Sequence, residues 1–352
     1  VAVDLTVMER NIKWLSKLAK EAGVKLRPHT KTHKSPEIAQ LQIAHGASGI
    51  TTATLGEAEV MAEAGIDDIL IGFPLIGKVK LQRFVALVRK VKNVMTAFDD
   101  IEIAKGISDV GQALGRTIPV YIDIDTGLHR MGRSPEDSVD HIVQIARLPN
   151  IEVRGLMSHT GHAYKMESDA EILAVAQEDA TLMQQTKEQL QKRGIDIPEI
   201  SIGATATARF IKDIPYATEM RPGMYVFNDR FVMEAGGATV EDCAVSVLAT
   251  VVAKPTTDRI IIDAGSKTLA MDPFRRGGHG LIVGHDNLIL RTLSEEHGTI
   301  EVQGHTDLTI GDVIRIVPNH VCPVINLADD LFGIRDGRLE KMIPVKARGK
   351  NR

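Results

Sequence analysis

Apolar and polar positions along the first two thirds of the chain follow two spacings in turn. Leu5, Met8, Ile12, Leu15 and Leu18 recur at near-helical spacing and predict a helix that ends at Gly23. Short apolar runs then predict eight strands, at about 24–28, 49–53, 69–72, 92–97, 118–124, 152–158, 198–202 and 217–225. Helical spacing returns between them, for example at 36–45, 56–64, 78–90, 136–147 and 167–193. A strand and a helix that alternate eight times favour a (β/α)8 barrel over a doubly wound sheet.

The pattern changes after about residue 235. β-branched runs broken by Gly, Asp and Pro occur at 244–253, 259–263, 281–283, 298–302 and 313–317, without a long amphipathic helix. This texture predicts a smaller β-rich domain. We therefore expect a barrel domain at 4–235 and a β-rich C-terminal domain at 236–352, which the first few residues of the chain could join.

Composition narrows the class of protein. The chain has 352 residues, of which 43% are hydrophobic and 25% charged, as in ordinary globular proteins. No apolar run of about 18 residues and no signal peptide is found, so we expect a cytoplasmic protein without membrane attachment. A net charge of -4 argues against nucleic acid as a partner. The two cysteines, Cys243 and Cys322, give no disulfide framework, which fits a reducing compartment.

The segment 27–34, Arg-Pro-His-Thr-Lys-Thr-His-Lys, concentrates basic side chains at one point. A charge run of this kind is usually a solvated turn. Here, however, a short strand at 24–26 precedes it, and Ser35-Pro36 then opens a helix as N-cap and first helical residue. Lys31 is therefore predicted in a strand-to-helix loop, where α/β proteins carry their sites.

Other polar segments follow the later predicted strands, on the side where barrels of this kind have their active sites. Arg130 lies after the fifth strand, and His159 and His162 lie after the sixth. The residues after the seventh strand and at the end of the eighth combine small side chains, hydroxyl groups and glycine, and we expect them to bind a phosphate group: they are Gly203, Thr205, Thr207, Arg221, Gly223, Met224 and Tyr225. A loop lysine that faces a phosphate site suggests pyridoxal 5'-phosphate bound covalently to Lys31.

Several motifs then resemble a known family. The segment 29–34, Met157-Ser158-His159 and Arg221-Pro222-Gly223 look like those of the fold-type III pyridoxal phosphate enzymes, of which alanine racemase is a member. More closely, the chain resembles the D-threonine aldolase and D-serine dehydratase family, in four motifs spread over both halves of the sequence: 27–34, 263–267, 294–298 and 318–322.

The resemblance implies a role for individual residues. Lys31 would hold the cofactor, with Lys34 as the rival lysine; His159 would lie against the pyridine ring, and Arg130 and Arg221 would approach its oxygen or nitrogen. In this family a divalent ion is bound at the positions of His320 and Cys322. A strand-like segment would place these two side chains on one face, and imidazole with thiolate favours zinc, with manganese or magnesium as further options.

An additional Lewis acid suggests a substrate with a β-hydroxyl group. We expect a metal-assisted lyase that cleaves D-3-hydroxy amino acids such as D-threonine to glycine and an aldehyde, with His162 as the base for the hydroxyl proton. A D-serine or D-3-hydroxy-amino-acid dehydratase that releases a keto acid and ammonia uses the same groups, and an amino-acid racemase is a further alternative. A homodimer is expected by analogy with this fold type. The sequence leaves open the preferred β-substituent, the native metal and the choice between aldolase and dehydratase.

Overall fold

The computed structural model describes residues 1–275 and 277–352, which divide into two compact units. One unit consists of Trp14–Lys31, Ser35–Gly223 and Gly349–Arg352, and the other of Val1–Lys13, Thr32–Lys34 and Met224–Arg348. Helix α1 (Leu5–Ala22) runs through the division. The domain ranges expected from the sequence, 4–235 and 236–352, stay a prediction, because a unit that is compact in its contacts need not fold independently.

The first unit is built on an eight-stranded sheet in the order β2-β9-β8-β7-β6-β5-β4-β3, in which every pairing is parallel. Its strands are β2 (Lys25–Leu26), β3 (Ile50–Thr52), β4 (Asp68–Ile71), β5 (Asn93–Phe98), β6 (Ile118–Asp123), β7 (Ile151–Met157), β8 (Glu199–Ile202) and β9 (Glu219–Met220). A parallel bridge between His29 and Thr51 joins the chain beyond β2 to β3, the two ends of that order. The sheet therefore curls back on itself, which confirms the predicted (β/α)8 fold class.

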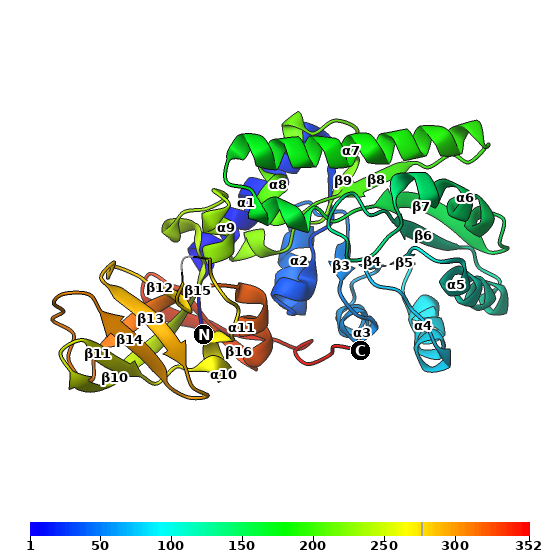
Figure 1. The fold of residues 1–352 in the computed structure, drawn as a ribbon. Helices are drawn as coiled ribbons and strands as arrows, with labels where there is room; N and C mark the ends of the chain where they lie inside the picture. The colour runs from blue at the N-terminus through cyan, green and yellow to red at the C-terminus, as the bar shows by residue number, and fades with distance from the viewer. Residues whose placement is uncertain (276) are drawn as a thin grey trace. The chain divides into compact units, whose positions relative to one another are not determined.

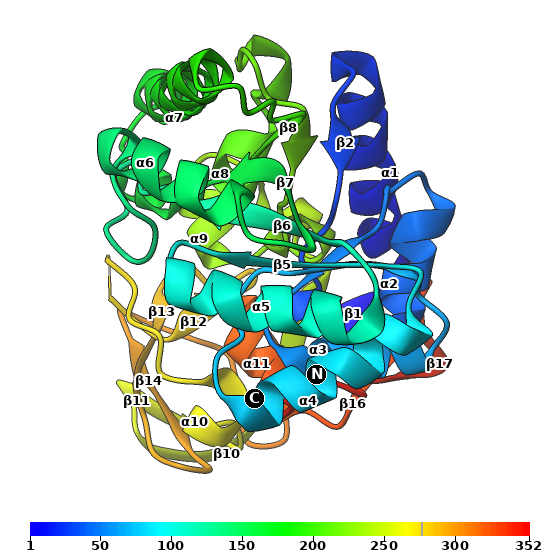
Figure 2. The same ribbon diagram turned by 90° about the vertical axis from the view of Figure 1, so that its right-hand side faces the viewer.

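Helices connect successive strands and lie on the outside of the sheet, as Figures 1 and 2 show for α4 to α7. They are α2 (Pro36–Ala44), α3 (Leu55–Glu63), α4 (Lys78–Lys90), α5 (Ile101–Leu114), α6 (Pro135–Ala146), α7 (Asp169–Lys192) and α8 (Thr205–Ala208). The last connection before β9 contains only α8 and the 3-10 turn η3 (Ile211–Asp213). Parallel strands need such crossovers, since a tight turn cannot join them.

Helix ends follow the local sequence closely. Ser168 caps α7 with its side chain, which accepts a hydrogen bond from the Glu171 amide, and Glu171 bonds back to the cap residue. Ser35 precedes α2 in extended backbone, as expected, but its side chain makes no capping bond. The predicted strand 217–225 was too long, because β9 ends at Met220 and Pro222, two residues on, has no N–H group to donate.

Buried charges fill part of the barrel. The Arg27 guanidinium, 5% exposed, pairs with Glu219 at 2.7 Å and with Asp68. The hydroxyl of Ser201 donates to the other oxygen of Glu219 at 2.6 Å. A small apolar cluster of Leu70, Met95, Ala97, Tyr121 and Met157 lies on strands β4 to β7. A buried ion pair of this kind is costly to break on one side only.

The second unit contains a nine-stranded sheet with the order β13-β14-β11-β10-β1-β16-β17 and a branch in which β15 pairs with β10 and β12. Its strands are β1 (Ala2–Asp4), β10 (Val245–Thr256), β11 (Arg259–Ile262), β12 (Gly280–Ile282), β13 (Leu288–Leu293), β14 (Gly298–Val302), β15 (Val313–Pro318), β16 (Asp330–Arg335) and β17 (Arg338–Pro344). The short helices α9 (Arg230–Glu234), α10 (Ser266–Leu269) and α11 (Val321–Leu327) interrupt them. Strand β1 lies between β10, to which it is antiparallel, and β16, to which it is parallel.

The apolar side chains of this sheet form one buried core, with Val251, Ile260, Ile300 and Ile316 among its members. The hairpin β16–β17 was missed by the sequence analysis. Its turn, Asp336-Gly337, is a typical hairpin signal, but charged and exposed residues flank it and hide the alternation. The smaller β-rich part expected after the barrel is nevertheless confirmed. Among the described residues no helix has both the length and the apolar character that crossing a bilayer requires, and cytoplasmic residence stays a prediction.

Candidate active site

Lys31 lies in the 3-10 turn η1 (Thr30–Thr32), between β2 and α2. Hydrogen bonds hold the turn to the segment after β9 and to helix α3. The amide of His29 donates to Pro222 O at 3.0 Å, and the hydroxyl of Thr30 donates to Glu57 at 2.6 Å. Glu57 is fully buried on α3 and also accepts from the Ala53 amide. The neighbours of Lys31 in the chain therefore hold the turn in one position, as the loop prediction requires.

Two half-buried histidines, His29 and His159, lie near this turn, and the charges around it shift their pKa values. Burial, followed by the charge of Lys31, lowers the pKa of His159 to about 3, and Arg130 and Arg221 act in the same direction. The pKa of His29 is lowered well below its ordinary value by burial and by the same three cations. Both imidazoles are thus neutral near pH 7, and His159 makes a 3.0 Å hydrogen bond from Nδ1 to Gly203 O. The loops after β2, β6 and β9 bring three cations together around neutral rings, which suits an anionic ligand.

Arg221 is fixed by hydrogen bonds at the end of β9. Its Nη1 donates to the Ser201 hydroxyl at 2.5 Å and its Nη2 donates to the carbonyl of Ser158. Only 7% of the residue is exposed. The position of its positively charged guanidinium is therefore fixed by the fold.

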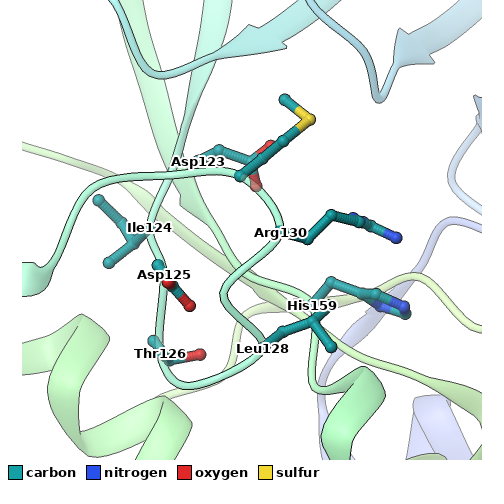
Figure 3. A pocket seen from close by; sticks show the side chains of 8 residues that line it. Asp123, Ile124, Asp125, Thr126, Leu128, Arg130 and His159 are labelled. Atoms are coloured by element: carbon teal, nitrogen blue, oxygen red, sulfur yellow. The ribbon is translucent and has the colours of Figure 1, made fainter.

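Figure 3 shows a pocket beside this charge cluster, of about 240 Å³ including the open space at its mouth. The side chains of Arg130 and His159 extend in the same direction there. Its lining is completed by Asp123, Ile124, Asp125, Thr126, Leu128 and Met131. Burial raises the pKa of Asp123 to about 6, against the opposing charges of Arg221 and Arg130. The sequence analysis missed Asp123, although its place next to the end of the predicted strand 118–124 was a usable signal.

The segment after β8, expected to bind phosphate, is tightly folded. Gly203 has φ of 127°, a conformation that side chains rarely adopt, and a Cβ there would lie 3.3 Å from the Arg221 amide. The Thr207 hydroxyl donates to Ala204 O at 3.1 Å, and the phenol oxygen of Tyr164 accepts from the Ala206 amide at 3.3 Å. Thr205 is buried, as is Tyr225 in the other unit. The expected combination of Gly203, Thr205 and Thr207 with Gly223, Met224 and Tyr225 stays a prediction.

His162 lies in the 3-10 turn η2 (Gly161–Lys165), with its ring against Gly127 of the loop after β6. Among the described residues its Nδ1 atom is buried without a hydrogen-bond partner. Burial lowers the pKa of His162, while Asp125 and Glu178 oppose the shift. A neutral imidazole with an unpaired ring nitrogen is able to accept a proton.

His320 and Cys322 come together in the second unit. They form a hydrogen-bonded pair, and the Cys322 thiol donates to Thr32 Oγ1 at 3.3 Å. Thr32 directly follows Lys31 in the chain. The predicted strand-like geometry was wrong, because His320 is the N-cap of α11 and Cys322 is inside that helix. The helix begins here because the Val321 amide donates to the carboxylate of Asp229 at 2.9 Å.

Asp229 is the residue that sequence analysis missed at this site. Its Oδ2 lies 3.1 Å from Nδ1 of His320, and the ring of Phe231 packs on the imidazole at 5.5 Å between centroids. Burial alone would lower the pKa of His320, but Cys322 and Asp229 together raise it to about 11. A carboxylate behind a histidine is the usual orienting group of a metal ligand. Within 1–275 and 277–352, however, no three His, Cys, Asp or Glu side chains gather as a metal site, so an ion here would need water or substrate as further ligands.

Comparison with known proteins agrees with this geometry. Residues 3–230 match the family described as "Alanine racemase, N-terminal domain", and residues 244–334 match the "Putative serine dehydratase domain". D-threonine aldolase from Arthrobacter sp is 34% identical over 100% of this chain and 93% of that protein. D-threo-3-hydroxyaspartate dehydratase from Delftia sp. is 32% identical over 91% of this chain and 89% of that protein. A solved structure of a cysteine-to-alanine variant of a D-threo-3-hydroxyaspartate dehydratase is described as the metal-free form.

The fold is also that of a solved aldolase. D-threonine aldolase from Filomicrobium marinum superimposes with a TM-score of 0.91 at 30% identity, covering 99% of this chain and 94% of the other. Fold and charge cluster thus define the class of alanine racemase-like, fold-type III enzymes, which use pyridoxal phosphate. Within that class the chain belongs to the D-threonine aldolase and D-serine dehydratase family of lyases.

The residues present fit the cofactor that this family implies. A lysine in an anchored turn, two further cations and two neutral histidines would be able to provide a covalent link and a countercharge for a phosphorylated, phenolic ring. Gly203, which has no side chain, leaves room for backbone to approach a phosphate closely.

Proposed function

We propose that the protein is a metal-assisted, pyridoxal phosphate-dependent aldolase that cleaves D-3-hydroxy amino acids, with D-threonine as a representative substrate, to glycine and an aldehyde. The observation that carries the proposal is the Cys322 thiol at 3.3 Å from Thr32, the residue that follows Lys31. Cys322 and Thr32 lie in the same compact unit, and Thr32 adjoins Lys31 in the sequence.

Lys31 would hold the cofactor, Gly203, Thr205, Thr207, Gly223, Met224 and Tyr225 its phosphate, and Arg130, His159 and Arg221 its ring. The cofactor would supply the electron sink that accepts the electrons of a bond broken at Cα. Arg221, fixed by Ser158 and Ser201, keeps a positive charge at one position. Neutral His159, whose Nδ1 bonds to Gly203 O, keeps its ring in one orientation.

The hydroxyl group of the substrate needs a proton acceptor and a group that binds its oxygen. His162 is the proposed acceptor, since its lowered pKa keeps it neutral at pH 7 and its Nδ1 has no partner among the described residues. His320 and Cys322 would hold a zinc or manganese ion, with magnesium as a further option, that supplies Lewis acidity. Asp229 holds Nδ1 of His320 in a hydrogen bond, which leaves Nε2 of the same ring for the ion.

A dehydratase that acts on D-serine or a related D-3-hydroxy amino acid is the second candidate. It is supported by the match of residues 244–334 to a serine dehydratase domain and by the similarity to the Delftia enzyme. The proposed groups serve both reactions, and they differ in whether the Cα–Cβ bond or the Cβ–O bond breaks. A metal-independent racemase would need neither His320 nor Cys322.

One assay separates these reactions. Holoenzyme loaded with pyridoxal phosphate and Mn²⁺ is incubated with D-threonine, and the products are quantified. We expect glycine and acetaldehyde in equal amounts, and loss of turnover after a chelator has removed the ion. Release of 2-oxobutyrate and ammonia instead would establish the dehydratase, and D-to-L conversion that survives chelation would establish the racemase.

Two lysine variants test the cofactor residue in the same preparation. Lys31→Ala should lose both turnover and the visible absorbance band of the lysine-bound cofactor. Lys34→Ala, the matched control three residues along, should keep the band. The opposite result would transfer the role to Lys34.

A further inference from the structure

Asp179 is a buried carboxylate in the middle of the long helix α7, with 1% of the residue exposed. A buried charge is unfavourable unless hydrogen bonds satisfy it. Both of its oxygens are satisfied, because Oδ1 accepts from the Thr126 hydroxyl at 2.5 Å and Oδ2 accepts from the Ser158 hydroxyl at 2.9 Å. The proposed mechanism uses none of these three side chains.

The two hydroxyl groups belong to two loops of the active site. Thr126 lies in the loop after β6 that carries Arg130, and it lines the pocket of Figure 3. Ser158 follows β7 and directly precedes His159. One carboxylate thus joins the segments that present Arg130 and His159. Loops at the end of a sheet are otherwise the most variable parts of such a fold.

Ser158 also links Asp179 to Arg221. The carbonyl of Ser158 accepts from its Nη2, while Nη1 donates to Ser201, whose hydroxyl donates to Glu219. The charges of Asp179 and Arg221 also attract each other, as the opposing influence of each on the other's pKa indicates. A change at Asp179 therefore reaches three residues expected at the cofactor.

We propose that Asp179 is a positioning residue that locks the Arg130 loop and the His159 segment into one rigid arrangement through Thr126 and Ser158. Its effect on turnover rests on the proposed function, but its effect on the loops does not. Arg130 and His159 face one pocket from different loops, and their relative position depends on the contact between those loops. Misplacement by about 1 Å is enough to lower a catalytic rate a hundredfold.

The test uses holoenzyme and a pair of variants at Thr126. Thr126→Val has the same shape without the hydroxyl, whereas Thr126→Ser keeps the hydroxyl. Hydrogen exchange is followed at Gly127 and His129, whose amides donate to Asp125 in the loop and report its opening. We expect exchange about tenfold to a hundredfold faster in Thr126→Val, as for a lost charge-assisted hydrogen bond, and within about twofold of wild type in Thr126→Ser.

Asp179→Asn and the double variant Asp179→Asn/Thr126→Val complete a double-mutant cycle, in which the hydrogen-exchange rates of the loop amides are compared. If Asp179 acts through Thr126, the double variant exchanges no faster than the worse single variant. Glu188→Gln, an exposed carboxylate on the same helix, is the matched control and should change nothing. In the variants whose loop amides exchange faster, the visible absorbance of the bound cofactor and kcat for D-threonine should both fall, while KM changes little.

Equal exchange in Thr126→Val and Thr126→Ser would overturn the proposal, as would simple additivity in the cycle. Faster exchange spread evenly over the chain would also overturn it, since Asp179 would then be an ordinary core residue. Failure of wild-type enzyme to cleave D-threonine would reject the proposed function alone, because the exchange comparison needs no turnover.

Discussion

At the scale of single residues, the site depends on carboxylates that orient other groups. Asp229 contacts His320 with one carboxylate oxygen and caps α9 with the other, which accepts from the Val232 amide at 3.0 Å. Asp179 and Glu57 do the same for the loops of the barrel. Each of these side chains holds a neighbour in place, and none belongs to a motif that sequence analysis identified.

Replacing Asp229 with Asn should weaken binding of the proposed ion by about 10- to 100-fold, the usual effect of removing a carboxylate behind a metal-bound histidine. Asparagine is also a good N-cap, so α9 should persist. Affinity is measured by competition with a chelator. Glu241→Gln, an exposed carboxylate of the same unit, serves as the control, and equal affinities in all three proteins would contradict the orienting role.

His159 predicts an acid sensitivity with a definite sign. Its pKa is about 3 in the fold and near 6.5 in an unfolded chain, so below pH 6.5 only the unfolded state takes up the proton. Stability contributed by neutral His159 is therefore present above pH 6.5 and is lost as the pH falls towards 3. In urea unfolding of apoprotein, wild type should lose roughly 1.4 kcal/mol more per pH unit below 6.5 than His159→Gln.

The comparison with His159→Gln isolates one group, because His29, Asp123 and Asp179 titrate in both proteins. The raised pKa values of the two aspartates, about 6 each, act in the opposite direction: their folded forms bind the extra proton between pH 3.8 and 6. Parallel pH profiles for wild type and variant would mean that His159 titrates normally in the fold.

At the scale of elements, periodicity predicted the helices well and the ends of strands poorly. The helix expected at 167–193 is α7, Asp169–Lys192, because an apolar stripe and a capping box both mark it. The strand expected at 217–225 has two residues, and the strand expected at His320-Val321-Cys322 is the start of a helix. In the first case Pro222 has no N–H group to extend the strand, and in the second the Val321 amide donates to the side chain of Asp229. An apolar pattern carries no information about either.

The capping box of α7 gives a prediction at this scale. Ser168→Ala removes the side chain that accepts from the Glu171 amide and should lower the free energy of unfolding by about 1 kcal/mol. The measurement is urea denaturation at pH 7. Ser168→Asp keeps an acceptor at the N-cap and should restore most of the loss. A loss of the same size in both variants would show that the cap contributes nothing.

At the scale of the whole molecule, hydrogen bonds connect residues far apart in the sequence into a buried chain. It runs from Thr126 and Asp179 through Ser158, Arg221, Ser201 and Glu219 to Arg27 and Asp68. The sequence predicted Lys31, Arg130, His159 and Arg221 from loop positions and from resemblance. The residues that hold them, such as Asp179, look like ordinary helix or strand residues, since only the folded chain brings their partners together.

Within this series of hydrogen bonds, we expect the stability of the fold to depend most on Glu219. Glu219→Gln leaves the buried Arg27 guanidinium with one carboxylate fewer, and the free energy of unfolding should fall by about 3–5 kcal/mol. Glu152→Gln breaks the half-exposed pair with Arg154 and should cost less than about 1 kcal/mol. Both are measured by urea unfolding, and similar losses would mean that water reaches Arg27. The expected homodimer stays a prediction at this scale.

Strand β1 has a consequence for how the protein is made. Residues Ala2–Asp4 leave the ribosome before their partners, since β10 begins at Val245 and β16 at Asp330. The first strand must therefore wait unpaired until β10 has been synthesised, and its other neighbour, β16, follows only near the end of the given sequence. Until it is inserted, β10 and β16 each present an open edge that could pair with another nascent chain. The yield of active protein should thus depend on how readily β1 reaches its place between β10 and β16.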